Sequence, residues 1–175
     1  MSLIFQKPPF TYQYQVGVEN DVDYDNDDVI ITGAISNAPL GSVVLQSGAL
    51  IRDGQRLFIC AGGRQTGTGS KTFLLRVNGS NLFSSNAITP ANNTGWFLRS
   101  ELFRRSNNSL HVETLFVYNT GDGAGGAAPL LVSGVNISFS SINDIAATLL
   151  TFEMLGTIVV AAETIRQTKM SLSVL

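Results

Sequence analysis

The chain contains one cysteine and one histidine among its 175 residues, and this scarcity excludes several kinds of chemistry. Cys60 alone cannot form an intrachain disulfide, so no disulfide framework holds the fold. It lies between Ile59 and Ala61, which favours a small buried side chain over a reactive thiol. His111 alone cannot build a histidine-rich metal centre. The sequence also offers no recognisable nucleophile–base pair.

Charged residues are also few. They make up 14% of the chain, against about 25% in a typical soluble domain. The 11 basic and 13 acidic residues give a net charge of −2, so we expect no basic field and no nucleic-acid partner. A surface with so few charges is typical of a subunit that buries part of itself in a homo-oligomer. The alternative is a monomer covered by serine, threonine, asparagine and glycine.

No long apolar run is present. The longest one near the C-terminus, Ile158–Ala162, is far shorter than the roughly 20 residues that cross a bilayer as a helix. The N-terminus lacks a charged segment followed by a long apolar run, so we expect no secretory signal, no membrane partner and folding in a cytoplasm. Pro8 and Pro9 disfavour helix, and residues 1–10 are expected to form an extended arm. The candidate contact residues of this arm are Leu3, Ile4, Phe5 and Phe10.

Apolar residues alternate with a period of two in three stretches, Gln55–Gly63, Ser70–Asn78 and Gly95–Arg105. This spacing indicates β-strands. Both faces of these strands carry apolar groups, which is typical of sheets that pack on each other inside and on partners outside. The face expected to form the core carries Leu57, Ile59, Phe73, Leu75, Trp96 and Leu98. The opposite face is a candidate subunit interface, with Phe58, Leu74, Phe97 and Phe103.

Short alternating segments separated by turn signals continue along most of the chain. Asn78-Gly79 and Arg52-Asp-Gly54 predict hairpin turns. The apolar run within Asn143–Leu155 favours a further strand because of its threonine, leucine and phenylalanine content. Together these segments predict ten or eleven strands and no helix. We therefore expect an all-β fold, a jelly-roll β-sandwich of roughly 8–11 strands, with a single domain over residues 11–175 after the arm.

The stretch from Glu19 to Asp28 is the one run of charge. Asp21, Asp23 and Asp25 have the alternating spacing of a calcium loop, and they are the candidate ligands for a hard cation. The template then fails, because Asn26 replaces the turn glycine and Thr32 stands where a bidentate glutamate belongs. A solvated acidic loop that binds no metal is the expected structure.

No catalytic motif is present. A glycosidase needs two carboxylates that flank its substrate. Glu101 and Glu113 occupy strand positions, but the sequence does not show whether they face each other, and we expect Arg99 and Arg105 to neutralise Glu101. A non-enzymatic protein without a cofactor is therefore expected. Trp96 is expected to fill the core rather than to form a platform for a ligand.

The order of several short motifs is similar to that of a known group of proteins. Asp53–Leu57 (DGQRL) precedes Lys71–Val77 (KTFLLRV), Asn81–Phe83 (NLF) and Gly95–Arg105 (GWFLRSELFRR), and a threonine- and leucine-rich strand follows around Asp144–Gly156. The chain then ends on Leu-Ser-Val-Leu. Over Val43 to Leu175, this order resembles the jelly-roll domains of structural proteins in tailed-bacteriophage virions. Such domains occur as trimeric head-decoration (cement) proteins and as distal modules of tail fibres and spikes.

The resemblance implies a structural virion protein that is assembled in the host bacterial cytoplasm. The leading expectation is a capsid decoration protein that forms a homotrimer, binds the phage major capsid protein across subunit junctions and stabilises the head. The arm 1–10 is the leading candidate for that contact. The alternative is a tail-fibre or receptor-binding module that recognises a host glycan or surface protein. No shaft sequence precedes the domain, which favours the decoration protein.

Overall fold

The computed structural model describes residues 20–25, 28–90, 92–119, 127–138 and 144–175, with the backbone alone for 20–25 and 127–138. These residues form eleven strands and no helix. The strands are β1 (Asn20–Asp25), β2 (Val29–Thr32), β3 (Ile35–Leu45), β4 (Arg56–Thr66), β5 (Lys71–Val77), β6 (Ser80–Ser84), β7 (Thr94–Ser106), β8 (Ser109–Asn119), β9 (Ala127–Ser138), β10 (Leu150–Ile158) and β11 (Thr164–Val174).

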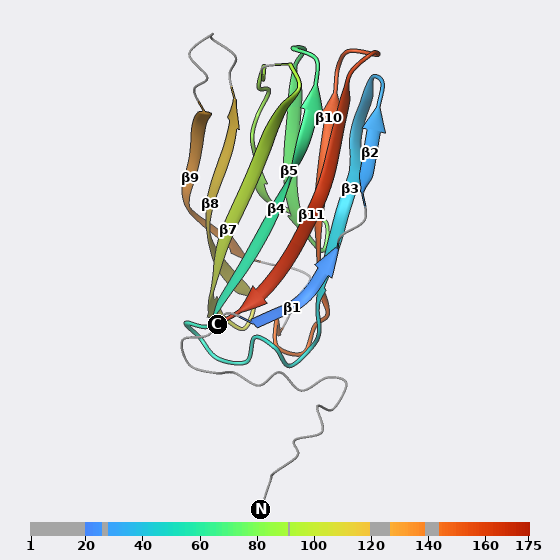
Figure 1. The fold of residues 1–175 in the computed structure, drawn as a ribbon. Helices are drawn as coiled ribbons and strands as arrows, with labels where there is room; N and C mark the ends of the chain where they lie inside the picture. The colour runs from blue at the N-terminus through green and yellow to red at the C-terminus, as the bar shows by residue number, and fades with distance from the viewer. Residues whose placement is uncertain (1–19, 26–27, 91, 120–126, 139–143) are drawn as a thin grey trace, which may run out of the picture.

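The strands pair antiparallel in two sheets that lie face to face (Figure 1). Sheet A has seven strands in the order β1-β11-β4-β7-β8-β9, and β2 also pairs with β11. Sheet B has four strands in the order β3-β10-β5-β6. The prediction of an all-β sandwich is confirmed. Strands β4 and β5, which are neighbours in the sequence, belong to different sheets.

The core lies between the sheets and is made by one face of each strand. The core residues predicted for β4, β5 and β7 are all buried. Trp96 is 4% exposed, and its ring centroid lies 4.8 Å from that of Phe73. Its Nε1 donates a hydrogen bond to the carbonyl of Arg166 at 3.3 Å. The indole therefore fills the core, as predicted, with its apolar body packed and its N–H satisfied.

The two predicted hairpin turns have different outcomes. Asn78 and Gly79 have φ values of 44° and 82° and join β5 to β6, so this hairpin is confirmed. Positive φ at both central positions is the requirement of a type I′ turn. Asp53 and Gly54 also form a turn, but it lies between β3 of sheet B and β4 of sheet A. The prediction of a hairpin at Arg52-Asp-Gly54 is therefore wrong, because the two strands do not pair.

The strand expected within Asn143–Leu155 begins later than predicted. Residues 144–148 form turns, and β10 starts at Leu150. The cause is Asp144, whose carboxylate accepts the amide of Ala146 at 2.9 Å and whose carbonyl accepts the hydroxyl of Thr148 at 2.6 Å. Such local hydrogen bonds compete with strand pairing.

The acidic run is a strand over part of its length rather than the expected loop. Residues 20–25 pair with β11 from Asn20↔Val174 to Asp25↔Met170, with a bulge between Asp21 and Asp23. Pairing with β11 gives the backbone N–H and C=O groups of β1 hydrogen-bond partners within the sheet, and the charge pattern of the sequence does not indicate this. The predicted arm 1–10 lies outside the described residues.

A glycine on the inner face of β4 makes room for a bulge in β11. The β4–β11 register shifts between Gln167 and Lys169. A Cβ on Gly63 would lie 1.9 Å from the carbonyl oxygen of Arg166, a distance that no side chain tolerates. The same carbonyl accepts the hydrogen bond from Trp96. The bulge, the glycine and the core tryptophan therefore depend on one another.

We expect Gly63→Ala to lower the free energy of unfolding by about 1–3 kcal/mol, because the added methyl group forces the backbone of β11 to move. Chemical unfolding followed by tryptophan fluorescence measures this loss. Gly95→Ala is the matched control, since a Cβ there meets its nearest atom at an ordinary 3.6 Å. Equal stability of the two variants would contradict the role assigned to Gly63.

Candidate functional site

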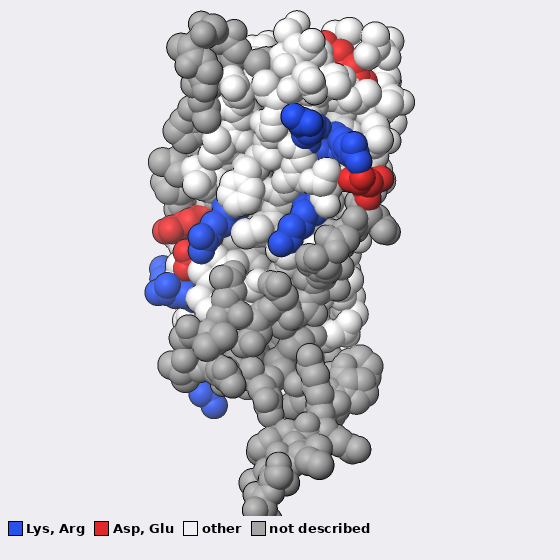
Figure 2. Space-filling view, in the orientation of Figure 1, with Lys and Arg blue, Asp and Glu red and all other residues white. Residues whose placement is uncertain are grey.

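The outer face of sheet A, which points away from the core, is rich in arginine and phenylalanine. Cross-strand pairing aligns its residues in rows, such as Phe103 beside Arg56 and Leu115 beside Arg99. Basic side chains spread over this side of the molecule in Figure 2. We call this surface the arginine face and define it by Arg56, Phe58, Arg64, Phe97, Arg99, Phe103, Arg105, Arg166 and Lys169.

Two of these arginines lie over phenylalanine rings. The Arg99 guanidinium is 4.7 Å from the ring centroid of Phe58, and the Arg56 guanidinium is 5.1 Å from that of Phe103. Each of these distances is within the range of a cation–π interaction. Phe97 is 42% exposed on the same face. The face thus combines ordered hydrogen-bond donors with apolar surface that water solvates poorly.

The carboxylates on this face each lie close to a basic side chain. Glu101 and Glu113 lie directly opposite each other on β7 and β8, an arrangement that like charges disfavour. Arg56 pairs with Glu101 at 3.3 Å, and the Nε2 of His111 lies 3.5 Å from Glu113. The predicted partners of Glu101 were wrong, because Arg99 stacks on Phe58 and Arg56 makes the ion pair.

Asp28 supplies a further ion pair at the margin of the face. It accepts hydrogen bonds from the guanidinium of Arg166, which lies on β11. This hydrogen bond, with the charge of Arg166, holds the pKa of Asp28 below its ordinary value. The carboxylate therefore stays charged over a wider range of pH than an isolated aspartate.

The structure separates the four predicted interface residues of the strands. Phe58, Phe97 and Phe103 share the arginine face, whereas Leu74 lies on the outer face of sheet B, beside Leu155. The sequence pattern placed all four on one kind of face but did not reveal that β4 and β5 belong to different sheets. Leu3, Ile4, Phe5 and Phe10 lie outside the described residues. Cys60, expected to be buried, lies on the outward face of β4 and is only partly buried.

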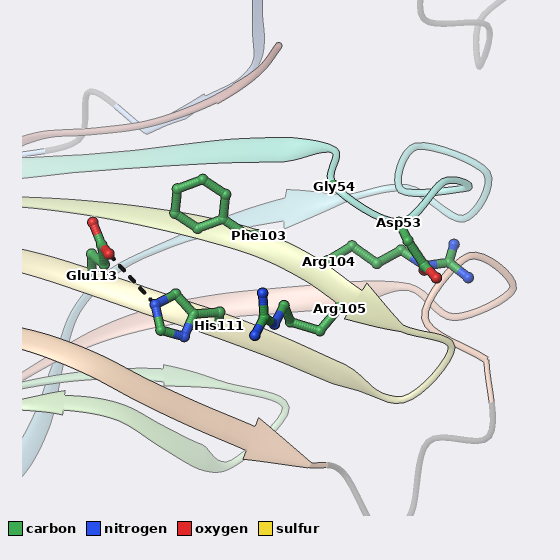
Figure 3. A pocket seen from close by; sticks show the side chains of 7 residues that line it. All are labelled: Asp53, Gly54, Phe103, Arg104, Arg105, His111 and Glu113. Atoms are coloured by element: carbon green, nitrogen blue, oxygen red, sulfur yellow. Dashed lines mark ion pairs between the residues drawn. The ribbon is translucent and has the colours of Figure 1, made fainter.

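An open hollow of about 440 Å³ lies at one end of the arginine face (Figure 3). The side chains of Glu101 and Glu113 are 25% and 53% exposed; Glu113 lines the hollow, and Glu101 lies opposite Glu113 on β7. The hollow is lined by Asp53, Gly54, Phe103, Arg104, Arg105, His111 and Glu113.

Arg104 in this hollow has a structural role. Its guanidinium donates to the carbonyl of Leu50 and to the amide oxygen of Asn107, the latter at 2.6 Å. Its Nε lies 3.2 Å from the carboxylate of Asp53. A buried cation therefore joins the β3–β4 loop to the β7–β8 turn, and its charge is used inside the subunit.

A second buried cation lies at the opposite end of the sandwich. Lys71 is fully buried, and its Nζ lies 2.7 Å from the carboxylate of Glu163. The same Nζ donates to the carbonyls of Gly67 and Gly69 at 3.4 and 3.3 Å. The amide of Gly69 donates to the other carboxylate oxygen at 2.7 Å. The glycine-rich loop thus holds a carboxylate of its own chain, which leaves no room for an external anion at this carboxylate site.

These contacts decide the protonation of Glu163. Burial alone would raise the pKa of Glu163, but the hydrogen bond and charge of Lys71 and the amides of Gly69 and Thr68 outweigh it. The pKa is therefore held below its ordinary value of 4.5.

Within the described part of the chain, no three His, Cys, Asp or Glu side chains lie close enough together to bind a metal. The side chains of Asp21, Asp23 and Asp25 lie outside what is described. No helix in the described ranges is long and apolar enough to cross a membrane. No family model matches the chain, and no curated protein matches it.

We expect Glu163→Gln to destabilise the protein by about 3–5 kcal/mol, because it leaves the charge of Lys71 buried without its partner. The double variant Lys71→Met, Glu163→Leu should recover most of this loss, since it removes both charges. Urea unfolding of the wild type and the two variants measures the difference. A single variant as stable as the wild type would contradict the role of the pair.

Stability should also fall with acid in a way that depends on Glu163. Because its pKa is depressed in the folded state, its contribution is complete above the unfolded pKa of about 4.5 and is lost as the pH falls through the lower folded value. Urea unfolding at a series of pH values between about 6 and 3 tests this. Glu163→Gln should show a flatter dependence, and parallel curves would contradict the prediction.

Proposed function

We propose that this chain is a structural assembly protein that works by binding other protein subunits through the arginine face. The observation that carries the proposal is the composition of that face. Arginine and aromatic residues are enriched where proteins bind each other. The outer face of sheet A carries five arginines, three phenylalanines and one lysine, alongside Glu101, Glu113 and His111. The exposed ring of Phe97 is a candidate anchor on this face.

We infer further that the sandwich is of the jelly-roll type. In support, β2, β11, β4 and β7 are successive neighbours in sheet A, and β3, β10, β5 and β6 are successive neighbours in sheet B. The chain crosses between the sheets from β2 to β3, β3 to β4, β4 to β5, β6 to β7, β9 to β10 and β10 to β11. Such interleaving is typical of two Greek keys wound into a double sheet. Strands β8 and β9 would then extend sheet A.

The sequence resemblance narrows the kind of assembly. Within the proposal, the chain is a decoration protein of a tailed-phage head that forms a trimer and binds the major capsid protein across subunit junctions. Many weak contacts on one shell add up by multivalency, so a modest interface in each copy is enough to reinforce it. The arm 1–10 would supply a second contact, because an extended segment can add a strand to an exposed sheet edge.

A receptor-binding module of a tail fibre is the second candidate. The observation in its favour is the open hollow, where Phe103 offers an aromatic edge beside the polar groups of Asp53, His111 and Glu113 (Figure 3). Sugars bind to such combinations of an aromatic ring and polar groups. Binding of the full chain to a glycan array, lost on Phe103→Ala, would favour this candidate over the decoration protein.

Phe97→Ser should weaken assembly at least about tenfold, because it removes an exposed aromatic anchor without disturbing the core. Two measurements check this: the native mass of the full chain by sedimentation, and its saturable binding to phage heads that lack their decoration protein. Leu149→Ser is the matched control, since Leu149 is 48% exposed but lies in the loop before β10. A wild-type chain that neither self-associates nor binds heads would overturn the proposed function.

A further inference from the structure

We propose that the hollow at the end of the arginine face binds an acidic sugar, a ligand that carries a carboxylate together with several hydroxyl groups. Uronic acids and sialic acids belong to this class. The hollow lies between the β3–β4 loop and the β7–β8 hairpin (Figure 3). The inference goes beyond the proposed role in assembly, and it rests on the second candidate function for the kind of ligand, since that candidate assigns sugars to this hollow.

Backbone hydrogen bonds hold the walls of the hollow in place. The amide of Gly54 donates to the carbonyl of Arg104 at 2.8 Å, and the amide of Arg104 donates to the carbonyl of Gln55 at 3.0 Å. A Cβ on Gly54 would meet no atom within 4 Å. The turn is therefore fixed against β7, while its glycine leaves the space beside it open. The volume of about 440 Å³ falls within the range of about 300–1,000 Å³ that is usual for small-molecule sites.

An irregularity in β7 presents a basic side chain to the hollow. The β7–β8 register shifts between Arg104 and Ser106, so Arg105 has no residue opposite it in β8. Such a bulge bends its strand and redirects a side chain, and bulges are frequent next to active sites. Arg105 is exposed and makes no ion pair with any described residue. It is therefore the cation best placed to bind the carboxylate of a ligand through two parallel hydrogen bonds.

The carboxylates of the hollow suit the hydroxyl groups of a sugar. Asp53 lies 3.2 Å from the Nε of Arg104, and Glu113 lies 3.5 Å from the Nε2 of His111. Both carboxylates are exposed, and their oxygens have further lone pairs that can accept hydrogen bonds. Because each already lies near a basic side chain, a neutral hydroxyl suits it better than a second cation. This favours a sugar over an amino acid, which would bring an ammonium group.

Phe103 supplies the apolar contact. Its ring lines the hollow, and its centroid lies 5.9 Å from that of the His111 ring. The C–H groups on one side of a sugar ring leave water when they pack on an aromatic ring, which favours binding. Small-molecule sites combine such apolar surface with a few polar groups that fix the orientation of the ligand. The hollow thus offers a cation for a carboxylate, acceptors for hydroxyl groups and a ring for the C–H face.

The open shape of the hollow limits the ligand further. A bound molecule would stay partly in contact with water, because the hollow is not enclosed by the protein. The terminal residue of a longer glycan fits this arrangement better than a free metabolite, which a site usually surrounds. A nucleic acid fits less well, since Asp53 and Glu113 would repel its row of phosphates.

The test is calorimetric titration of the full chain with two matched pairs of sugars, sialyllactose with lactose and glucuronic acid with glucose. At least one acidic sugar should bind at least about tenfold more tightly than its neutral counterpart, because only the acidic sugar makes the charge-assisted hydrogen bonds to Arg105. Arg105→Gln should abolish this preference, and Phe103→Ala should weaken binding of the acidic sugar at least about threefold. Arg76→Gln removes the same charge from the outer face of sheet B and is the matched control, which should bind as the wild type does.

Several results would overturn the inference: no binding of either acidic sugar, equal binding of acidic and neutral sugars, unchanged preference in Arg105→Gln, or tighter binding of free glutamate than of either acidic sugar. Circular dichroism identifies any variant that loses its fold, and the comparison of acidic with neutral sugars on the wild type needs no variant.

The native mass separates this inference from the proposed function. Arg105→Gln should keep the wild-type mass, and Phe97→Ser should keep the sugar binding, because the two residues serve different contacts. If neutral sugars bind as well as acidic ones, the second candidate function stands and only this inference fails. If the chain binds acidic sugars but neither self-associates nor binds phage heads, the role in assembly fails and this inference stands.

Discussion

The buried ion pair between Lys71 and Glu163 is the constraint on which one end of the molecule depends. Lys71 opens β5 in sheet B, and Glu163 directly precedes β11 in sheet A, so the pair joins the two sheets. Two glycines are required around it, because a Cβ on Gly67 or Gly69 would lie 2.2 or 2.7 Å from the Glu163 carboxyl group. A charge in an apolar interior is tolerated only when every donor and acceptor is matched, and this requirement sets the path of both loops.

The other end is held in a similar way by Arg104, which binds groups on the β3–β4 loop and the β7–β8 turn. Both buried cations thus join segments of the chain that are distant in sequence. The side chains that remain available for binding a partner lie on the outer faces of the two sheets. On sheet A, arginines lie on phenylalanine rings and Phe97 is exposed. These arginine–phenylalanine contacts and the exposed ring of Phe97 are the reason for proposing that assembly uses the outer face of sheet A.

The sequence predicted individual strands well because side-chain alternation is a local property. Leu57, Ile59 and Trp96 were expected in the core and are buried there. Errors occurred where a short polar residue competes with the strand, as Asp144 does. They also occurred where a turn signal says nothing about which strands it joins, as at Asp53-Gly54. The pairing of Glu101 with Arg56 spans 45 residues of sequence and depends on the register of β4 and β7.

By itself, the sequence determined the class of the fold and which side of each strand faces inward, because both follow from the period of two and from the positions of glycine, asparagine and proline. Only the tertiary structure decided which strands share a sheet. That decision placed Phe58, Phe97 and Phe103 on one surface and Leu74 on the other. It also gathered six basic residues, scattered from Arg56 to Lys169, on one face of a chain whose net charge is −2. The physical reason is that sheet pairing depends on long-range contacts, and composition sums charges without regard to where the fold brings them.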